Sequence, residues 1–261
     1  MNEQAVATAA AILRGHIDRR TRLVELPQEC RPASRADGYA VQAELWRQSG
    51  EACAGWKIAA TSTAGQAHIG VDGPLAGRLW RSRILADPAR VTLAGSAMRV
   101  IEAEFVFQLD RPLPPRGAAY EVDEVMAAVG RLFVGMEVPD SRYENFVVVG
   151  APQLIADNAC AWLYVLGNEV TLPWRERDLR AQPVVAYRNG EATARGDGSA
   201  VLGDPRLALT WIANELARFD EGLKAGELVT TGTCIKPMEV AAGDRVRLGF
   251  GDLGEVSATF D

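Results

Sequence analysis

The segment Arg99–Leu109, which reads R-V-I-E-A-E-F-V-F-Q-L, constrains the fold more than any other part of the chain. It predicts a buried β-strand. Because strand side chains alternate between two faces, Glu102 and Glu104 share one face and four apolar side chains share the other. Two adjacent carboxylates repel each other and are costly to bury. Either a cation lies between them, or the strand is at a sheet edge where both glutamates contact water.

The composition is that of a globular protein, with 48% hydrophobic and 24% charged residues in a chain of 261. The net charge of −6 argues against a general surface for nucleic acid or anionic membrane. Four scattered cysteines and two histidines show no zinc-ligand spacing. The N-terminus has no basic segment followed by an apolar core, and no apolar run approaches the ~20 residues of a membrane span. We therefore expect a cytoplasmic protein.

The N-terminal part is predicted to be helical. Apolar residues at three- and four-residue spacing indicate an amphipathic helix over residues 3–20. A second helix is expected over residues 34–49, where Ser34 and Asp37 resemble a capping box. These helices predict an N-terminal helical cap over residues 1–52 and a β-rich catalytic domain over residues 53–261.

Strands dominate the rest of the chain. We expect them at 55–60, 99–109, 133–138, 162–166, 183–188, 227–233, 244–250 and 255–260. Short helices are expected after Ser62, after Asp123 (a helix reaching Val129 and Leu132) and after Asp204. Residues 146–156 are expected to form strand and loop. Because strands and helices do not alternate regularly, the pattern favours an α+β fold over a doubly wound sheet.

A third carboxylate, Glu137, lies in a second apolar strand. Three oxygen ligands without His or Cys suit Mg²⁺ or Mn²⁺, with open positions for water or a chelating 2-oxo acid. Lys57 also has apolar flanks. It is either a surface or ion-paired lysine, or a partly desolvated acid–base group with a lowered pKa. Asp72 and the pair Asp157-Asn158 are either turn residues or site residues.

Seven motifs then occur in a characteristic order: G-W-K-I-A-A-T-S, G-V-D-G-P-L-A-G, I-E-A-E-F, M-E-V-P-D-S-R, A-D-N-A, T-G-T and G-D-R-V. From about residue 34 onward the chain resembles the 2-keto-4-pentenoate hydratase family of the fumarylacetoacetate hydrolase superfamily. The resemblance implies a mixed β-roll or sandwich with a small N-terminal helical part, and homo-oligomers built from dimers. It implies Mg²⁺ or Mn²⁺ on Glu102, Glu104 and Glu137, catalytic roles for Lys57 and Asp72, and substrate binding at Leu75, Asp157, Asn158 and Thr231.

One departure from the family pattern concerns the reaction. Hydratases of this type usually read G-V-D-x-P-D-[FY]-G, and the second Asp is taken as the partner of the lysine. Here Leu75 occupies that position and Asp72 matches only the first Asp. A leucine cannot accept a proton or orient a water, and loss of the neighbouring anion is expected to lower the pKa of Lys57.

The sequence therefore predicts a metal-dependent hydratase that adds water to a small 2-hydroxy-dienoate or 2-oxo-alkenoate in the catabolism of aromatic compounds. The metal would chelate the carboxylate and keto oxygens, and Lys57 would move the protons. The alternatives are a 2-oxo acid decarboxylase or C–C bond hydrolase of the same superfamily, and a catalytically idle 2-oxo acid binding protein. No nucleic-acid or membrane partner is expected.

Overall fold

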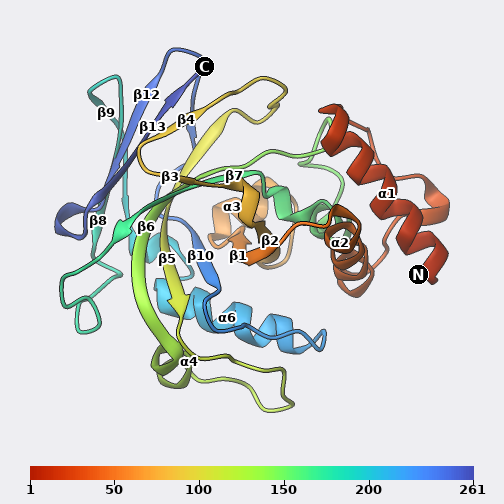
Figure 1. Cartoon of the computed structure of the whole chain (residues 1–261), viewed down its shortest axis with the longest axis horizontal. Helices are drawn as coiled ribbons and strands as arrows, with labels where there is room; N and C mark the ends of the chain where they lie inside the picture. Colours follow the sequence, from red (N-terminus) through yellow and green to blue (C-terminus); the bar gives the residue numbers. More distant parts are fainter.

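Two β-sheets form the body of the molecule, which a computed structural model describes over all residues 1–261 (Figure 1). The first sheet has eight strands in the order β2-β1-β10-β5-β6-β7-β3, with β11 paired to β5. Its strands are β1 (Cys53–Ala59), β2 (Leu75–Trp80), β3 (Ile84–Ala86), β5 (Val100–Leu109), β6 (Val129–Val138), β7 (Leu163–Glu169), β10 (Leu228–Thr233) and β11 (Met238–Glu239). The pairs β1–β10 and β3–β7 are parallel and the others antiparallel, so the predicted mixed sheet is confirmed.

The second sheet has five strands in the order β4-β13-β12-β8-β9. Its strands are β4 (Ala89–Val91), β8 (Pro183–Arg188), β9 (Glu191–Asp197), β12 (Arg245–Gly249) and β13 (Glu255–Phe260). The predicted hairpin at Asn189-Gly190 is confirmed, because these two residues join β8 to β9 with positive φ angles of 55° and 91°.

Six α-helices accompany the sheets: α1 (Glu3–Arg19), α2 (Arg35–Ser49), α3 (Thr63–His68), α4 (Val122–Ala128), α5 (Ala151–Ala156) and α6 (Pro205–Ala217). The capping predictions hold at three of them. Ser34 and Asp37 form a full capping box on α2, Ser62 accepts from Gly65 N on α3, and Asp204 accepts from Arg206 N on α6. None of the helices is long and apolar enough to cross a membrane.

The N-terminal helices α1 and α2 lie at the opposite end of the molecule from the five-stranded sheet (Figure 1). They have a small apolar cluster of their own, which includes Leu13, Val41 and Leu45 and reaches Trp80 of β2. This arrangement is compatible with the predicted cap over residues 1–52, and the boundary itself stays a prediction.

Two local predictions were wrong. The helix expected after Asp123 ends at Ala128, and Val129 and Leu132 belong to β6, where β-branched and aromatic side chains favour a strand. Residues 151–156, expected as strand and loop, form the helix α5 with Pro152 in its first turn. Short buried apolar runs do not distinguish the two states by periodicity.

The main core contains 50 buried residues, which come from both sheets and from helices such as α6. On β5, Phe105 and Phe107 face this core, and the rings of Phe105 and Phe250 meet edge to face with centroids 5.4 Å apart. Strand β5 lies between β10 and β6 rather than at an edge. Glu102 and Glu104 therefore do not lie on a solvated edge strand, and one of the two explanations for them is excluded.

Candidate metal centre

The pairing of β5 with β6 brings the three predicted carboxylates together. Glu102 lies directly opposite Glu137, and Glu104 lies opposite Gly135. One carboxylate oxygen from each glutamate can be chosen so that all three lie within 4.8 Å of one another. Glu104 and Glu137 are buried, and Glu102 keeps a partly exposed surface. The three side chains thus converge on a point at one face of the sheet.

Each of these carboxyls is perturbed by its surroundings. Burial and the charge of Glu137 raise the pKa of Glu102 to about 7, and the same causes raise the pKa of Glu104 well above its ordinary value. Burial also raises the pKa of Glu137, although Lys57 opposes that rise. Both oxygens of Glu104 lack a hydrogen-bond partner, and Glu137 has only an ion-pair contact with Lys57. Buried carboxylates without partners are costly, so the donor set fits a divalent cation.

Lys57 lies on the same face of the sheet, on β1. Its side chain is 2% exposed, and its Nζ lies 3.1 Å from Glu137 Oε1 and donates a hydrogen bond of 3.1 Å to the carbonyl oxygen of Ala159. Burial alone would lower the pKa of Lys57, but the charges of Glu137, Glu102 and Glu104 outweigh burial and raise it. Lys57 is therefore no surface lysine. The lowered pKa that we expected is wrong, because Glu137 supplies a neighbouring anion.

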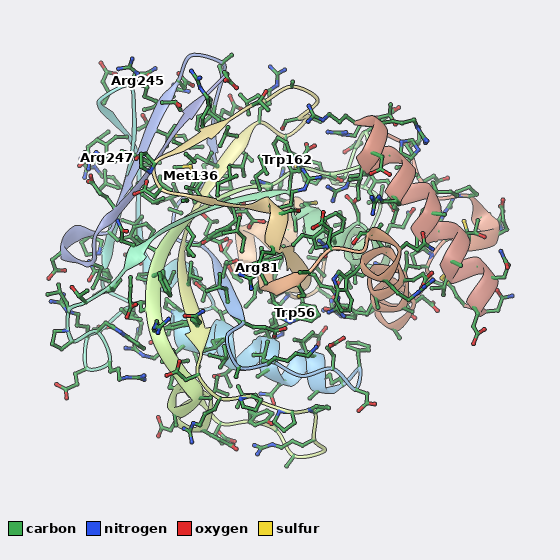
Figure 2. All side chains as sticks on the ribbon, viewed as in Figure 1. Trp56, Arg81, Met136, Trp162, Arg245 and Arg247 are labelled. Atoms are coloured by element: carbon green, nitrogen blue, oxygen red, sulfur yellow. The ribbon has the colours of Figure 1, made fainter.

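The side chains next to Lys57 and Glu137 in the sequence point to the opposite face of the sheet. Trp56 and Met136, both labelled in Figure 2, precede Lys57 and Glu137 in the chain and belong to the main core. The alternation along β1 and β6 thus separates an apolar face from the polar face that carries the site.

The carbonyl that binds Lys57 belongs to an unusual turn. The short 3₁₀ segment Asn158–Cys160 has three consecutive residues with positive φ, at 56°, 49° and 61°. Non-glycine residues adopt this region at a cost, so the surrounding structure must hold them there. A Cβ on Gly77 would lie 2.3 Å from the carbonyl oxygen of Asn158, which means that β2 approaches the turn as closely as a glycine permits.

Asp157 and Asn158 hold this turn in place. Asp157 forms a buried ion pair with Arg142 and accepts from Ser141 Oγ at 2.7 Å and from Arg142 N at 3.0 Å. The Asn158 side chain accepts from Arg78 N at 2.6 Å and donates to Arg78 O at 2.8 Å. Because protein groups already occupy these side chains, their geometry supports a positioning role rather than the predicted direct contact with substrate.

The remaining predicted residues lie in three different settings. Asp72 is exposed in the loop before β2, and the structure does not bring it to the carboxylates. Leu75 is 1% exposed and pairs with Ala59 across β2 and β1. Thr231 is fully buried and its Oγ1 donates to the carbonyl oxygen of Phe105 at 3.2 Å, so its hydroxyl is already occupied.

Two residues that we did not predict face the carboxylates. Thr230 pairs with Lys57 across β10 and β1, and its side chain counters part of the rise in the pKa of Glu104. Tyr164 pairs with Glu137 across β7 and β6, is buried, and has a hydroxyl without a hydrogen-bond partner. Its ring lies over Gly135, where a Cβ would come within 2.2 Å of Tyr164 Oη. Both hydroxyls are placed to support the glutamate ligands of a metal.

Comparison with known proteins agrees with this geometry. Residues 67–261 match the family described as fumarylacetoacetate (FAA) hydrolase C-terminal. The chain belongs to the fumarylacetoacetate hydrolase family. Within the family, it is 35% identical over 228 residues to the 4-oxalocrotonate decarboxylase of Pseudomonas putida, covering 86% of this chain and 85% of that protein. It is 31% identical over 262 residues to the 2-keto-4-pentenoate hydratase of Burkholderia vietnamiensis, covering 99% and 98%.

A solved structure of this family shares the whole fold. The 4-oxalocrotonate decarboxylase from Pseudomonas putida G7, complexed with magnesium and adipate, superposes with a TM-score of 0.91 at 31% identity and covers 100% of this chain and 99% of that one. A second structure of the same enzyme contains calcium and acetate, with a TM-score of 0.89. The fold prediction and the predicted family are therefore confirmed.

Proposed function

We propose that this fumarylacetoacetate hydrolase family member is a metal-dependent hydratase of small 2-hydroxy-dienoates or 2-oxo-alkenoates from aromatic catabolism. The observation that carries the proposal is the convergence of Glu102, Glu104 and Glu137 beside the buried ammonium of Lys57. The hydratases and decarboxylases to which the chain is similar support the substrate class, since their names describe unsaturated 2-oxo acids.

Glu102, Glu104 and Glu137 would hold Mg²⁺ or Mn²⁺. Such an ion acts as a Lewis acid that stabilises negative charge developing on a chelated 2-oxo acid. The hydroxyls of Thr230 and Tyr164 would orient the ligand carboxylates. The homologous structure with magnesium supports this choice of ion.

Lys57 would hold the proton that moves during the reaction. Its ammonium is held by the ion pair with Glu137 and by the hydrogen bond to the carbonyl oxygen of Ala159, and an ammonium with three N–H donors keeps capacity for a bound substrate. A positioned donor of this kind can protonate a substrate carbon or an oxygen that gains charge.

Leu75 favours a second candidate, decarboxylation. The residue is buried and cannot activate a water, whereas loss of CO₂ from a 2-oxo acid needs charge stabilisation and a proton donor but no activated water. The decarboxylase relative at 35% identity and its homologue with adipate, a six-carbon dicarboxylate, support this alternative.

A single pair of assays separates the candidates. With Mg²⁺, the hydratase proposal expects loss of the dienol absorbance of 2-hydroxypenta-2,4-dienoate, and the decarboxylase alternative expects CO₂ from an unsaturated six-carbon 2-oxo diacid. Metal and oxalate binding by calorimetry without turnover of either compound would instead indicate an idle binding protein.

Leu75→Asp tests whether the missing family Asp at this position limits hydration. Leu75→Asn, which has the shape of Asp without its charge, is the control. A gain in hydration for the Asp variant alone would identify a hydratase scaffold that lacks its proton partner. Equal rates for both variants would contradict that interpretation.

We also propose that the enzyme is a cytoplasmic homo-oligomer built from dimers, as the family resemblance implies. Sedimentation velocity of the purified full chain measures the assembly directly. A monomer at micromolar concentration would contradict it.

A further inference from the structure

A cavity of about 220 Å³ lies outside the metal centre, at the C-terminal end of α1. The turn at Ala94-Gly95 and Trp162, which is labelled in Figure 2, form part of its wall. Arginines dominate the rest of the lining, which contains Arg20, Arg22, Arg83 and Arg142. None of the three glutamates of the metal centre lines the cavity. Arg83, Arg142 and Trp162 also line a neighbouring pocket that reaches Glu137, so the cavity adjoins the metal centre. It differs from that site in its arginine-rich lining.

Two of the four arginines have carboxylate partners. Arg22 forms an ion pair with Asp140, and Arg142 forms one with the buried Asp157. The other acidic residue in the lining, Asp18, is paired with Arg14 at 2.9 Å. Every carboxylate at the cavity is thus already neutralised by a partner.

The other two arginines are not neutralised. Arg20 Nη1 donates only to the carbonyl oxygen of Ala94, at 3.2 Å. The Arg83 guanidinium is half-buried and has neither an ion pair nor a hydrogen bond within the protein. Burial lowers the pKa of Arg83, Glu51 opposes this, and the nearby positive charges of Arg142, Arg20 and Arg14 lower it further. The cavity therefore carries about two positive charges that the chain does not balance.

We propose that this arginine cavity binds a small oxyanion of charge −2, either inorganic phosphate or a short dicarboxylate. Guanidinium groups bind carboxylate and phosphate oxygens in pairs of parallel hydrogen bonds, which favours them for such ligands. Arg20 and Arg83 supply the unbalanced charge. Arg22 and Arg142 also line the cavity, but their Nη atoms already donate to groups of the protein. Arg83 contributes most, because all five of its N–H donors are free.

Thermal unfolding of the full chain tests the proposal at pH 7.5, in buffer passed over a chelating resin so that no divalent ion binds the ligand and no chelator competes with it. Sodium phosphate and sodium malonate are titrated separately against sodium chloride at constant ionic strength. We expect the unfolding midpoint of the wild-type protein to rise and to saturate at a low-millimolar concentration of at least one dianion. The dianion that saturates at the lower concentration identifies the ligand class. Chloride at the same ionic strength is expected to produce no saturable rise.

Arg83→Gln is the decisive variant, and Arg81→Gln is its matched control. Arg81 lies two residues away on the same short 3₁₀ segment, Arg81–Arg83, is exposed and does not line the cavity. We expect the apparent affinity for the dianion to fall at least tenfold in Arg83→Gln and to stay unchanged in Arg81→Gln. Because Arg83 has no partner to lose, Arg83→Gln in anion-free buffer should unfold at or above the wild-type midpoint. A retained Mg²⁺-induced shift verifies its fold.

Three outcomes would overturn the proposal. The first is an equal response of wild type and Arg83→Gln to each dianion, which would mean a general salt effect. The second is the absence of a saturable shift below about 20 mM, which corresponds to an affinity too weak for a built site. The third is a dianion-induced change in sedimentation coefficient, which would mean that an acidic surface of a second copy occupies the cavity.

Discussion

Replacing Glu102 with Gln should stabilise the protein in the absence of metal and destabilise it in the presence of metal. Burial and the charge of Glu137 raise the pKa of Glu102 from 4.5 to about 7. At roughly 1.4 kcal/mol per pKa unit, ionised Glu102 costs the folded state about 3 kcal/mol. Glutamine has nearly the same shape and no charge, so it removes this cost.

The pH dependence fixes the sign of the effect. Because the folded-state pKa of Glu102 is above the unfolded value, the cost is fully present above pH 7 and vanishes below about pH 4.5. We therefore expect Glu102→Gln to exceed wild type by up to about 3 kcal/mol at pH 8 in EDTA. The two proteins should converge at pH 4.5. For a chain of this size, the gain corresponds to roughly 6–12 °C in the unfolding midpoint.

Saturating Mg²⁺ should reverse the order. A ligand at a thousandfold excess over its dissociation constant stabilises the native state by about 4.1 kcal/mol, which exceeds the cost of about 3 kcal/mol, and the variant lacks one of the three carboxylates that bind it. Urea unfolding at pH 8, with EDTA and with Mg²⁺, measures both effects. Glu191→Gln, an exposed change at the start of β9, is the control and should change stability by less than about 0.5 kcal/mol. A Glu102→Gln protein that is less stable than wild type in EDTA at pH 8 would refute the reasoning.

Three further changes test other parts of the site. Lys57→Met should cost the metal-free protein about 3–5 kcal/mol in urea unfolding, because it leaves the buried carboxylate of Glu137 without its ion pair, and should abolish turnover. Gly135→Ala should cost about 1–3 kcal/mol, because the new methyl group would lie 2.2 Å from Tyr164 Oη, whereas Gly117→Ala has open space and should be near neutral. Mg²⁺ affinity by calorimetry should rise roughly tenfold from pH 6 to pH 8, because a proton on Glu102, with its pKa of about 7, competes with the metal. Equal affinity at the two pH values would contradict that competition.

The sequence allowed the convergence of the three glutamates to be predicted residue by residue, and their role as metal ligands stays a prediction. Alternation within one strand places Glu102 and Glu104 on the same face, and the order of the motifs identifies Glu137. The sequence could not provide the register that sets Glu102 opposite Glu137, since strand pairing depends on contacts distant in the chain.

Thr230 and Thr231 illustrate a local limit of prediction. Thr231 begins the T-G-T motif and Thr230 directly precedes it, and an irregularity in the pairing of β10 with β5 lies between Thr230 and Thr233. A bulge of this kind changes which side chain faces the carboxylates, and it leaves no signal in residue type alone. Tyr164 was missed for a related reason, because its relation to Gly135 arises from cross-strand packing.

Asp157 illustrates a different limit. A carboxylate next to an asparagine in an apolar segment is compatible with ligand binding, a turn or a buried ion pair. Only the position of Arg142, fifteen residues earlier in the chain, decides between them. The resemblance to a family indicated that this segment lies near the site, but it did not indicate what the side chains contact.

The left-handed turn Asn158–Cys160 has a consequence for how the reaction can diverge between relatives. Lys57 is held by the main-chain carbonyl of Ala159, which no side-chain substitution removes. The position of the ammonium therefore depends on the backbone of a turn that Asp157 and Asn158 anchor, whereas Leu75 makes no hydrogen bond to it. If Lys57 carries the proton as proposed, substitutions at Leu75 can change the reaction without moving the ammonium, which fits a family that contains both a hydratase and a decarboxylase relative of this chain.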